Sequence, residues 1–154
     1  LILGSFLHDV GHLVSLKDLH ENNKYKVIEY ENKPVTGLGL VNHDEVGALF
    51  LNKMGFSDRI SNFSKYHVLT MRYLITKDPS YLDRLSATSK ETFLLHGGTM
   101  KKDELDEFEL NEHKDNYIAM SQWDNEAIEL NYSYDKTRKI NYYQEMANDL
   151  LIKK

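Results

Sequence analysis

The chain has 154 residues, enough for one domain that buries roughly two-thirds of the surface of its unfolded form. Its 24 acidic and 19 basic residues give a net charge of -5, the wrong sign for a surface that neutralises nucleic-acid phosphates. With no cysteine, thiolate metal sites and cysteine nucleophiles are excluded, and any metal must be held by nitrogen and oxygen. We expect a cytoplasmic protein that binds neither nucleic acid nor membrane, because no apolar run approaches the roughly 18 residues of a membrane helix.

The first segment, GSFLHDVGHLV at residues 4–14, places polar side chains in an apolar pattern. Apolar residues recur there at helical spacing, which predicts a helix. His8 and Asp9 would project about 100° apart from it and could both reach one cluster. His12, four residues after His8, would return to the same side. A buried ionised carboxylate is costly without a partner or a metal, so Asp9 favours a site over an ordinary core.

Helical periodicity dominates the rest of the chain. Residues 24–40 mix alternating apolar residues with proline and glycine, which predicts a loop or short hairpin inserted between helices. Gly55 is placed to end one helix and Ser57 to cap the next, whereas the acidic run at residues 103–109 is predicted to be a solvated stretch. The predicted helices cover residues 43–54, 58–76, 81–85, 89–96, 112–130 and 138–152. The pattern therefore predicts an all-α bundle forming a single domain over residues 1–154.

Other segments carry further candidate ligands. Imidazole and carboxylate groups suit divalent iron, manganese or zinc, and His43, His67 and Asp124 add such groups to the pair in the first segment. Each has a simpler interpretation, because a lone histidine on an apolar helix is more often a hydrogen-bonded core residue, and Asp124 could cap a helix or pair with a lysine. His96 and His113 stand at helix ends, where we expect surface or capping roles.

LHDVGHL, at residues 7–13, resembles the His-Asp signature of the HD-domain superfamily. Later segments narrow the resemblance: HDEVGALFLNKMGF, HVLTMRYL, LSATSKETFLLHGGTM and QWDNEA are similar to the mixed-valence diiron oxygenases. The similarity is greatest to the 2-amino-1-hydroxyethylphosphonate dioxygenase branch, relatives of inositol oxygenase. LSATSKETFLLHGGTM is the most diagnostic block, because ordinary HD phosphohydrolases do not usually carry it. The resemblance covers most of residues 1–130 and implies an HD-type helical bundle.

The resemblance also implies a ligand set for two iron ions, Fe(II) and Fe(III). Asp9 would bridge the two ions, with His8 and Asp124 on one and His43 and His67 on the other. The family uses one more histidine, upstream of the His-Asp pair. We therefore expect the domain to lack its N-terminal helix.

The same resemblance assigns the substrate side. His12, Ser89 and Thr92 would face a small-molecule substrate, with Asp9 and His12 as the catalytic groups. Met71 stands where the family usually has a lysine, and Ser121 where the phosphonate branch has an arginine.

These two departures remove cations that would hold an anionic group, and they predict a less anionic substrate than that branch uses. The expected reaction is cleavage of a C–P or C–C bond of a small hydroxylated compound by dioxygen.

Two other functions remain open. The first is a metal-dependent phosphohydrolase that uses Mn, Mg or Zn on a phosphate ester or nucleotide. It would need Arg72 or Lys90 to hold the phosphate. The second is an HD module that binds a ligand without turnover. The sequence gives no indication of the oligomeric state.

Overall fold

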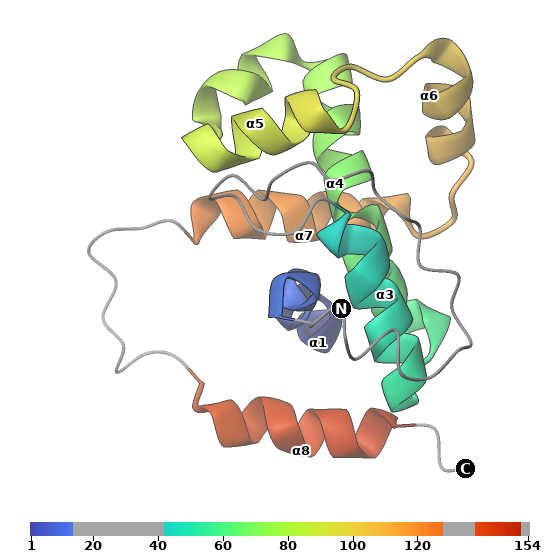
Figure 1. The fold of residues 1–154 in the computed structure, drawn as a ribbon, viewed down its shortest axis with the longest axis vertical. Coiled ribbons are helices and arrows are strands. Elements are labelled where there is room, and N and C mark those ends of the chain that lie inside the picture. Colours follow the sequence, from blue (N-terminus) through green and yellow to red (C-terminus); the bar gives the residue numbers. More distant parts are fainter. Residues whose placement is uncertain (14–41, 128–137, 152–154) are drawn as a thin grey trace, which may run out of the picture.

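The computed structural model describes residues 1–13, 42–127 and 138–151, and every regular element in these ranges is a helix (Figure 1). The predicted all-α fold is therefore confirmed for the described part of the chain. The loop or hairpin predicted over residues 24–40 lies outside the described residues. Among the described helices, none is long and apolar enough to cross a membrane.

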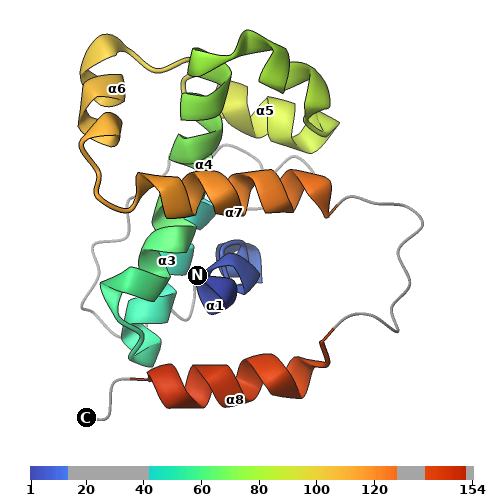
Figure 2. The ribbon, with the colours of Figure 1, turned by 180° about the vertical axis from the view of Figure 1, so that it is seen from behind.

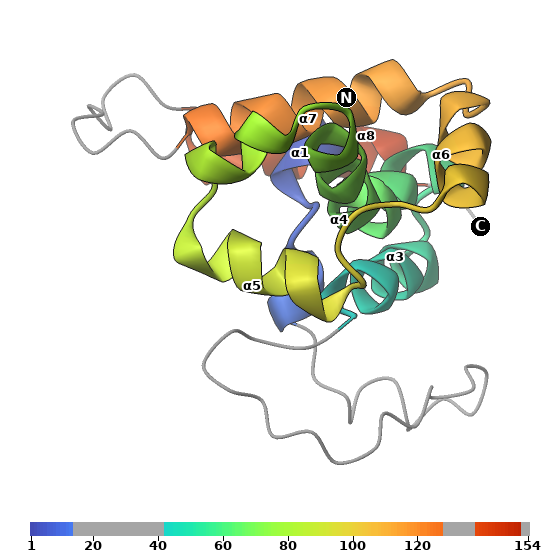
Figure 3. The same ribbon diagram turned by 90° about the horizontal axis from the view of Figure 1, so that it is seen from above.

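The long helix α4 (Asp58–Lys77) is the centre of the fold. Helices α3 (His43–Met54), α7 (Lys114–Glu126) and α1 (Ile2–Phe6) pack on one part of it (Figures 1 and 2). Helices α5 (Ala87–Leu95) and α6 (Lys102–Glu109) lie on opposite sides of its other part (Figure 3). Segments far apart in the sequence therefore meet around α4.

The core forms two clusters along α4. One joins α4 to α6 and α7 and contains Phe63, Tyr73, Met100, Phe108, Tyr117 and Met120. The other joins α4 to the 3-10 helix η2 (Pro79–Arg84) and α5, and contains Val68, Met71, Ile75, Tyr81, Leu85 and Phe93. Side chains recurring at helical spacing on α4 contribute to both clusters, as an amphipathic helix requires.

Several helix ends match the sequence signals. Gly55 ends α3 in the left-handed conformation, with φ of 99°. Ser57 precedes α4 as predicted, although its hydroxyl makes no capping hydrogen bond. Helix α5 begins earlier than predicted because Ser86 is its cap, and the Ser86 Oγ accepts a hydrogen bond from the backbone N–H of Ser89.

The prediction of one continuous helix in the first segment is wrong. Helix α1 ends at Phe6, residues 7–9 form a turn, and the 3-10 helix η1 (Val10–Leu13) follows. The cause is a close contact: a Cβ placed on Gly11 would lie 1.8 Å from the backbone oxygen of His43, so the chain bends to bring Gly11 against α3. His8 and Asp9 therefore lie in a turn and not in a helix.

The prediction for residues 103–109 is wrong in one respect: Asp103, Asp106 and Glu107 are exposed as expected of a solvated stretch, but the run forms the helix α6. Phe108, which is 2% exposed, anchors its inner face, and Glu104 pairs with Arg72 of α4. Helix α8 (Ile140–Leu150) begins two residues later than predicted. Tyr143 of α8 stacks on Phe6 with ring centroids 4.0 Å apart, which places α8 beside α1.

Candidate functional site

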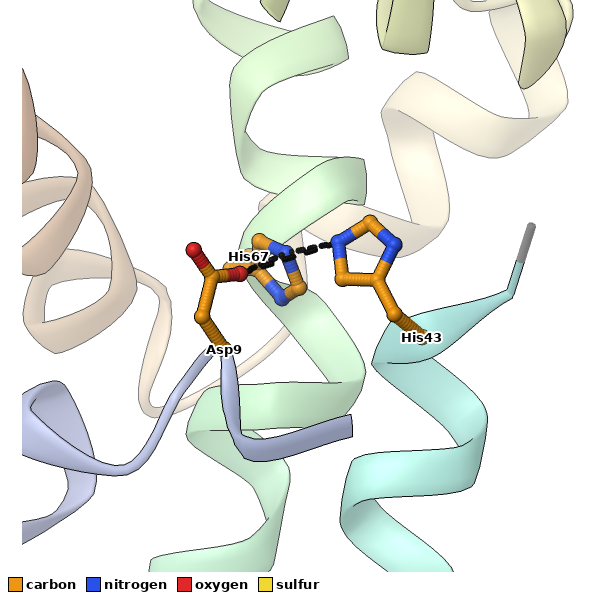
Figure 4. Close-up of side chains that lie close together, drawn as sticks. All are labelled: Asp9, His43 and His67. Atoms are coloured by element: carbon orange, nitrogen blue, oxygen red, sulfur yellow. Dashed lines mark hydrogen bonds and ion pairs between the residues drawn. The ribbon is translucent and has the colours of Figure 1, made fainter. Parts of the chain in front are cut away.

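Three predicted ligands from three segments meet at one point (Figure 4). Asp9 comes from the turn before η1, His43 is the first residue of α3, and His67 lies in the middle of α4. The Oδ1 atom of Asp9 is 3.2 Å from the Nε2 atom of His67 and 3.7 Å from that of His43. The two Nε2 atoms are 2.8 Å apart. The donor atoms of all three side chains therefore face one another.

A second group of donor atoms faces the other oxygen of Asp9. The Nε2 atom of His8 is 3.5 Å from the Oδ2 atom of Asp9 and 3.6 Å from the Oδ1 atom of Asp124. His8 is largely buried, whereas the two carboxylates are each about half exposed. The Oδ1 atom of Asp9 thus faces His43 and His67, and its Oδ2 atom faces His8. His8 in turn lies beside Asp124 of α7.

Backbone carbonyls fix the tautomers of two of these histidines. The Nδ1 atom of His8 is 2.7 Å from the carbonyl oxygen of Ser5, and the Nδ1 atom of His67 is 2.6 Å from that of Ser64. A carbonyl oxygen can only accept, so Nδ1 carries the hydrogen in both rings. The Nε2 atoms are left to face the centre, which is the arrangement of metal-binding histidines.

The electrostatics couple Asp9 to its histidines. Burial alone would raise the pKa of Asp9, but the hydrogen bond with His67 and the charges of His8 and His43 hold it well below its usual range. Burial alone would lower the pKa of His67, but the Asp9 carboxylate raises it instead. Asp9 and His67 thus each favour the charged form of the other, and a cation bound between them would compete with a proton on His67.

The donor set fits a metal ion. Ligands held about 2.1 Å from an octahedral ion lie about 3 Å from their neighbours. The separations here, from 2.8 to 3.7 Å, are close to that spacing, and the nitrogen and oxygen donors suit iron, manganese or zinc. Three histidines and two carboxylates packed this closely are costly to desolvate, and a bound cation would offset that cost.

His12 lies beside the ligand set. Its ring stacks on His43, with centroids 3.8 Å apart and planes within 18°. Desolvation lowers the pKa of His12, and the neighbouring His67 and His8 lower it further against the opposing effect of Asp9. The imidazole is therefore neutral at pH 7 and can accept a proton.

A cavity of about 110 Å³ opens beside the ligands, with its wall formed by the turn before η1, by α4, α5 and α7. Every site residue predicted from the sequence lines it: His8, Asp9, His12, His43, His67, Met71, Ser89, Thr92, Ser121 and Asp124. Five more residues line it that the sequence interpretation missed: Val68, Leu85, Thr88, Met120 and Asn125. Asn125 could have been found from its place beside Asp124. The apolar ones look like ordinary core residues in the sequence.

Among the described residues, no lysine or arginine lines this cavity. Arg72, one candidate phosphate anchor, is tied elsewhere: its Nε donates to the carbonyl oxygen of Gly98, and its guanidinium pairs with Glu104 at 2.8 Å. Lys90, the other candidate anchor, does not line the cavity. The described lining therefore offers an anion no lysine or arginine partner.

His96 has the capping role expected from its position: it is the C-cap residue of α5, and its Nδ1 donates to the carbonyl oxygen of Thr92. Only 15% of its side chain is exposed, so it is not a surface residue. Its Nε2 lies 4.0 Å from a carboxylate oxygen of Asp44, behind the ring of His43. The cause is that α5 ends against the start of α3. His113, by contrast, is 41% exposed at the start of α7.

Three known proteins are similar to the chain in sequence. No family model matches the chain. It is 31% identical to an uncharacterized protein of Acanthamoeba polyphaga mimivirus, over 97% of this chain and 65% of that protein. It is 33% identical to the 1-hydroxy-2-(trimethylamino)ethylphosphonate dioxygenase (glycine-betaine-forming) of Leisingera caerulea, over 80% of this chain and 56% of that enzyme.

A hydroxymethylphosphonate dioxygenase of Gimesia maris is 30% identical over 82% of this chain and 56% of its own length. The chain therefore spans between 56% and 65% of the length of these curated relatives. Two of the three are named as phosphonate dioxygenases, so the chain is similar in sequence to that class of enzyme.

Proposed function

We propose that this chain carries the active site of an HD-type oxygenase that uses two iron ions and dioxygen to cleave the C–P bond of a small hydroxylated phosphonate. The observation that carries the proposal is the orientation of Asp9, whose two oxygens face two different groups of ligands. A carboxylate placed in this way can bridge two ions. The two relatives named as phosphonate dioxygenases support the reaction class.

The residues divide between the two ions. His43 and His67 would hold one ion with the Oδ1 atom of Asp9, and His8 and Asp124 the other with its Oδ2 atom. Bound there, the iron pair would supply dioxygen activation and polarisation of the substrate hydroxyl. The carbonyls that fix the histidine tautomers keep the lone pairs directed inward and hold the ligand geometry before any ion binds.

The chain's own side chains would position the substrate and keep water out. Ser89 and Thr92 of α5 offer hydroxyl groups on one wall of the cavity, and Met71 offers an apolar, adaptable contact on α4. His12 stays neutral and can take a proton from the substrate hydroxyl as the substrate binds. The small volume of the cavity favours a substrate with few atoms beyond the hydroxyl and phosphonate groups.

A phosphohydrolase could use the same ligands, and the commitment of Arg72 to Glu104 and Gly98 weakens a phosphate ester and a phosphonate alike. The oxygenase is favoured because two relatives are named as phosphonate dioxygenases. A module that binds without turnover would retain metal and substrate affinity but consume no dioxygen. These functions differ in measurable products.

The test is a measurement of metal and oxygen together. Protein produced with iron and freed of loosely bound metal is expected to retain about two irons per chain. It should consume dioxygen with hydroxymethylphosphonate and release inorganic phosphate in equal amount. The His67→Ala variant should lose both iron and activity, while His113→Ala should keep both. Phosphate release from esters without oxygen uptake would establish a hydrolase instead, and iron retention with no product from any substrate would establish a binding module.

A further inference from the structure

Three neutral polar side chains outside the ligand set are linked behind the cavity wall. Tyr81 of η2 is 6% exposed, and its hydroxyl lies 3.5 Å from the Oγ atom of Ser121 on α7. Asn125, one turn further along α7, bonds through its Nδ2 atom to the Tyr81 hydroxyl and, at 3.0 Å, to the carbonyl oxygen of Ser121. Ser121 and Asn125 line the cavity, whereas Tyr81 is buried behind them.

The hydrogens of this network have one consistent direction. A backbone carbonyl can only accept, so the Asn125 atom facing the Ser121 carbonyl oxygen must be the NH2 group. The same NH2 group donates to the Tyr81 hydroxyl, which is therefore an acceptor from Asn125. The carbonyl oxygen of Ser121 already accepts from this NH2 group and, as a helical carbonyl, from the following turn of α7. The remaining hydrogen of Tyr81 is therefore assigned to the Oγ atom of Ser121.

The last hydrogen in the chain belongs to Ser121. Serine in a helix often donates to the carbonyl oxygen of the preceding turn, but among the described residues the Oγ atom of Ser121 has only Tyr81 within hydrogen-bond distance. Since the Oγ atom accepts from Tyr81, its own O–H remains available on the side that lines the cavity. Hydrogen bonds aligned in one direction also polarise one another.

We propose that Tyr81 and Asn125 are positioning residues that make Ser121 a hydrogen-bond donor to the substrate. The inference rests on the proposed function and specifies the group bound at this wall: an acceptor oxygen of the phosphonate, rather than an ammonium group. The direction of these hydrogen bonds also gives selectivity. A ligand without an acceptor oxygen at this wall would leave the buried Ser121 hydroxyl unpaired, which weakens its binding. Tyr81 acts through Ser121 and does not touch the substrate.

The test uses Tyr81→Phe and Ser121→Ala in the iron-loaded protein. Losing a hydrogen bond to a charged phosphonate oxygen corresponds to a loss of about tenfold or more. Each variant should raise the KM for hydroxymethylphosphonate by that factor with kcat and iron content nearly unchanged. The double variant should be no worse than Ser121→Ala alone, because Tyr81 acts through that hydroxyl. Ser121→Thr, which keeps the hydroxyl, should keep most of the affinity.

Tyr73→Phe is the matched control. Tyr73 is also a buried tyrosine, but its hydroxyl bonds to Glu109 and does not line the cavity. It should lower the thermal midpoint without changing KM. Equal KM values for wild type and Tyr81→Phe, or additive effects in the double variant, would overturn the inference while leaving the oxygenase proposal intact.

If wild type turns over no hydroxyphosphonate, the proposed function fails first. The inference is then decided by calorimetric titration of hydroxymethylphosphonate into the iron-loaded protein without oxygen. A Kd weakened about tenfold or more in Ser121→Ala and Tyr81→Phe would support it. A Kd unchanged by both variants, or no measurable binding to wild type, would refute it.

Discussion

Replacing Gly11 by alanine should disturb the site through the backbone alone. A Cβ at this position would lie 1.8 Å from the backbone oxygen of His43 and 2.9 Å from the amide nitrogen of Gly47. Neither neighbour is a flexible side chain, so η1 and α3 would have to separate by roughly 1.5 Å to restore ordinary contact distances. Gly11 follows Asp9 by two residues, and the obstructing oxygen belongs to a candidate ligand. The displacement therefore opens the Asp9–His43 gap directly.

The magnitude follows from the clash. Overpacking of this kind costs about 1 to 3 kcal/mol. For a chain of this length each kcal/mol lowers the thermal midpoint by about 2 to 4 °C, so Gly11→Ala should unfold about 2 to 12 °C below wild type. The donor separations of 3.2 and 3.7 Å around Asp9 tolerate no such shift, so iron content should fall as well. Differential scanning calorimetry and metal analysis measure the two effects.

Gly97→Ala is the control for this prediction. Gly97 has φ of 94°, so alanine is strained there, but the nearest atom to a new Cβ is 3.8 Å away on Arg72. This variant should also lose stability, by about 1 kcal/mol, while keeping its iron. If Gly11→Ala unfolds at the wild-type temperature with full iron content, the proposed role of the η1–α3 contact is wrong.

Three further predictions address other parts of the chain. Asp9→Asn removes the charge shared by both ligand groups and should abolish binding of both irons, whereas equal iron content in this variant and wild type would contradict the bridging role. Wild type should turn over 2-amino-1-hydroxyethylphosphonate weakly. Met71→Lys should lower the KM for phosphonates by about tenfold through a charge-assisted hydrogen bond, and it should also lower the thermal midpoint. An unchanged KM would show that Met71 is not near the anion. Glu109 has its pKa lowered to about 2 by hydrogen bonds from Lys114 first and then Tyr73, so the stability it adds is complete above about pH 4.5 and lost as the pH falls toward 2. Urea unfolding should therefore separate wild type from Glu109→Gln at pH 6 and much less at pH 2.5.

The sequence was sufficient for several helix ends because their signals are local. Gly55 at the end of α3 and Ser57 before α4 are read within a few residues, and both ends lie where these residues predict. The candidate ligands could also be named from residue type and motif. What could not be derived was their convergence, since His43 and His67 are 24 positions apart and only packing brings their rings together.

The wrong predictions share a physical cause, which is tertiary contact overriding local pattern. The run at residues 103–109 is acidic enough to be a solvated stretch, but Phe108 finds a buried site and Glu104 finds Arg72, so a helix forms. The first segment is apolar enough to continue as a helix, but the contact made by Gly11 bends it. In both cases the contacting residue, Arg72 or His43, lies about 30 positions away in the sequence, so the local pattern does not reveal it.

Small residues explain how η1, α3 and α4 can come so close. Gly11 lies against Gly47 of α3, and a Cβ on Gly47 would lie 2.2 Å from the Oγ atom of Ser64 on α4. The hydroxyl of Ser64 donates to the carbonyl oxygen of Asp44, and its own carbonyl accepts from His67. One column of small side chains thus joins η1, α3 and α4 directly beneath the ligands. A larger residue anywhere in this column would separate the histidines from Asp9, so the candidate metal site depends on this close packing.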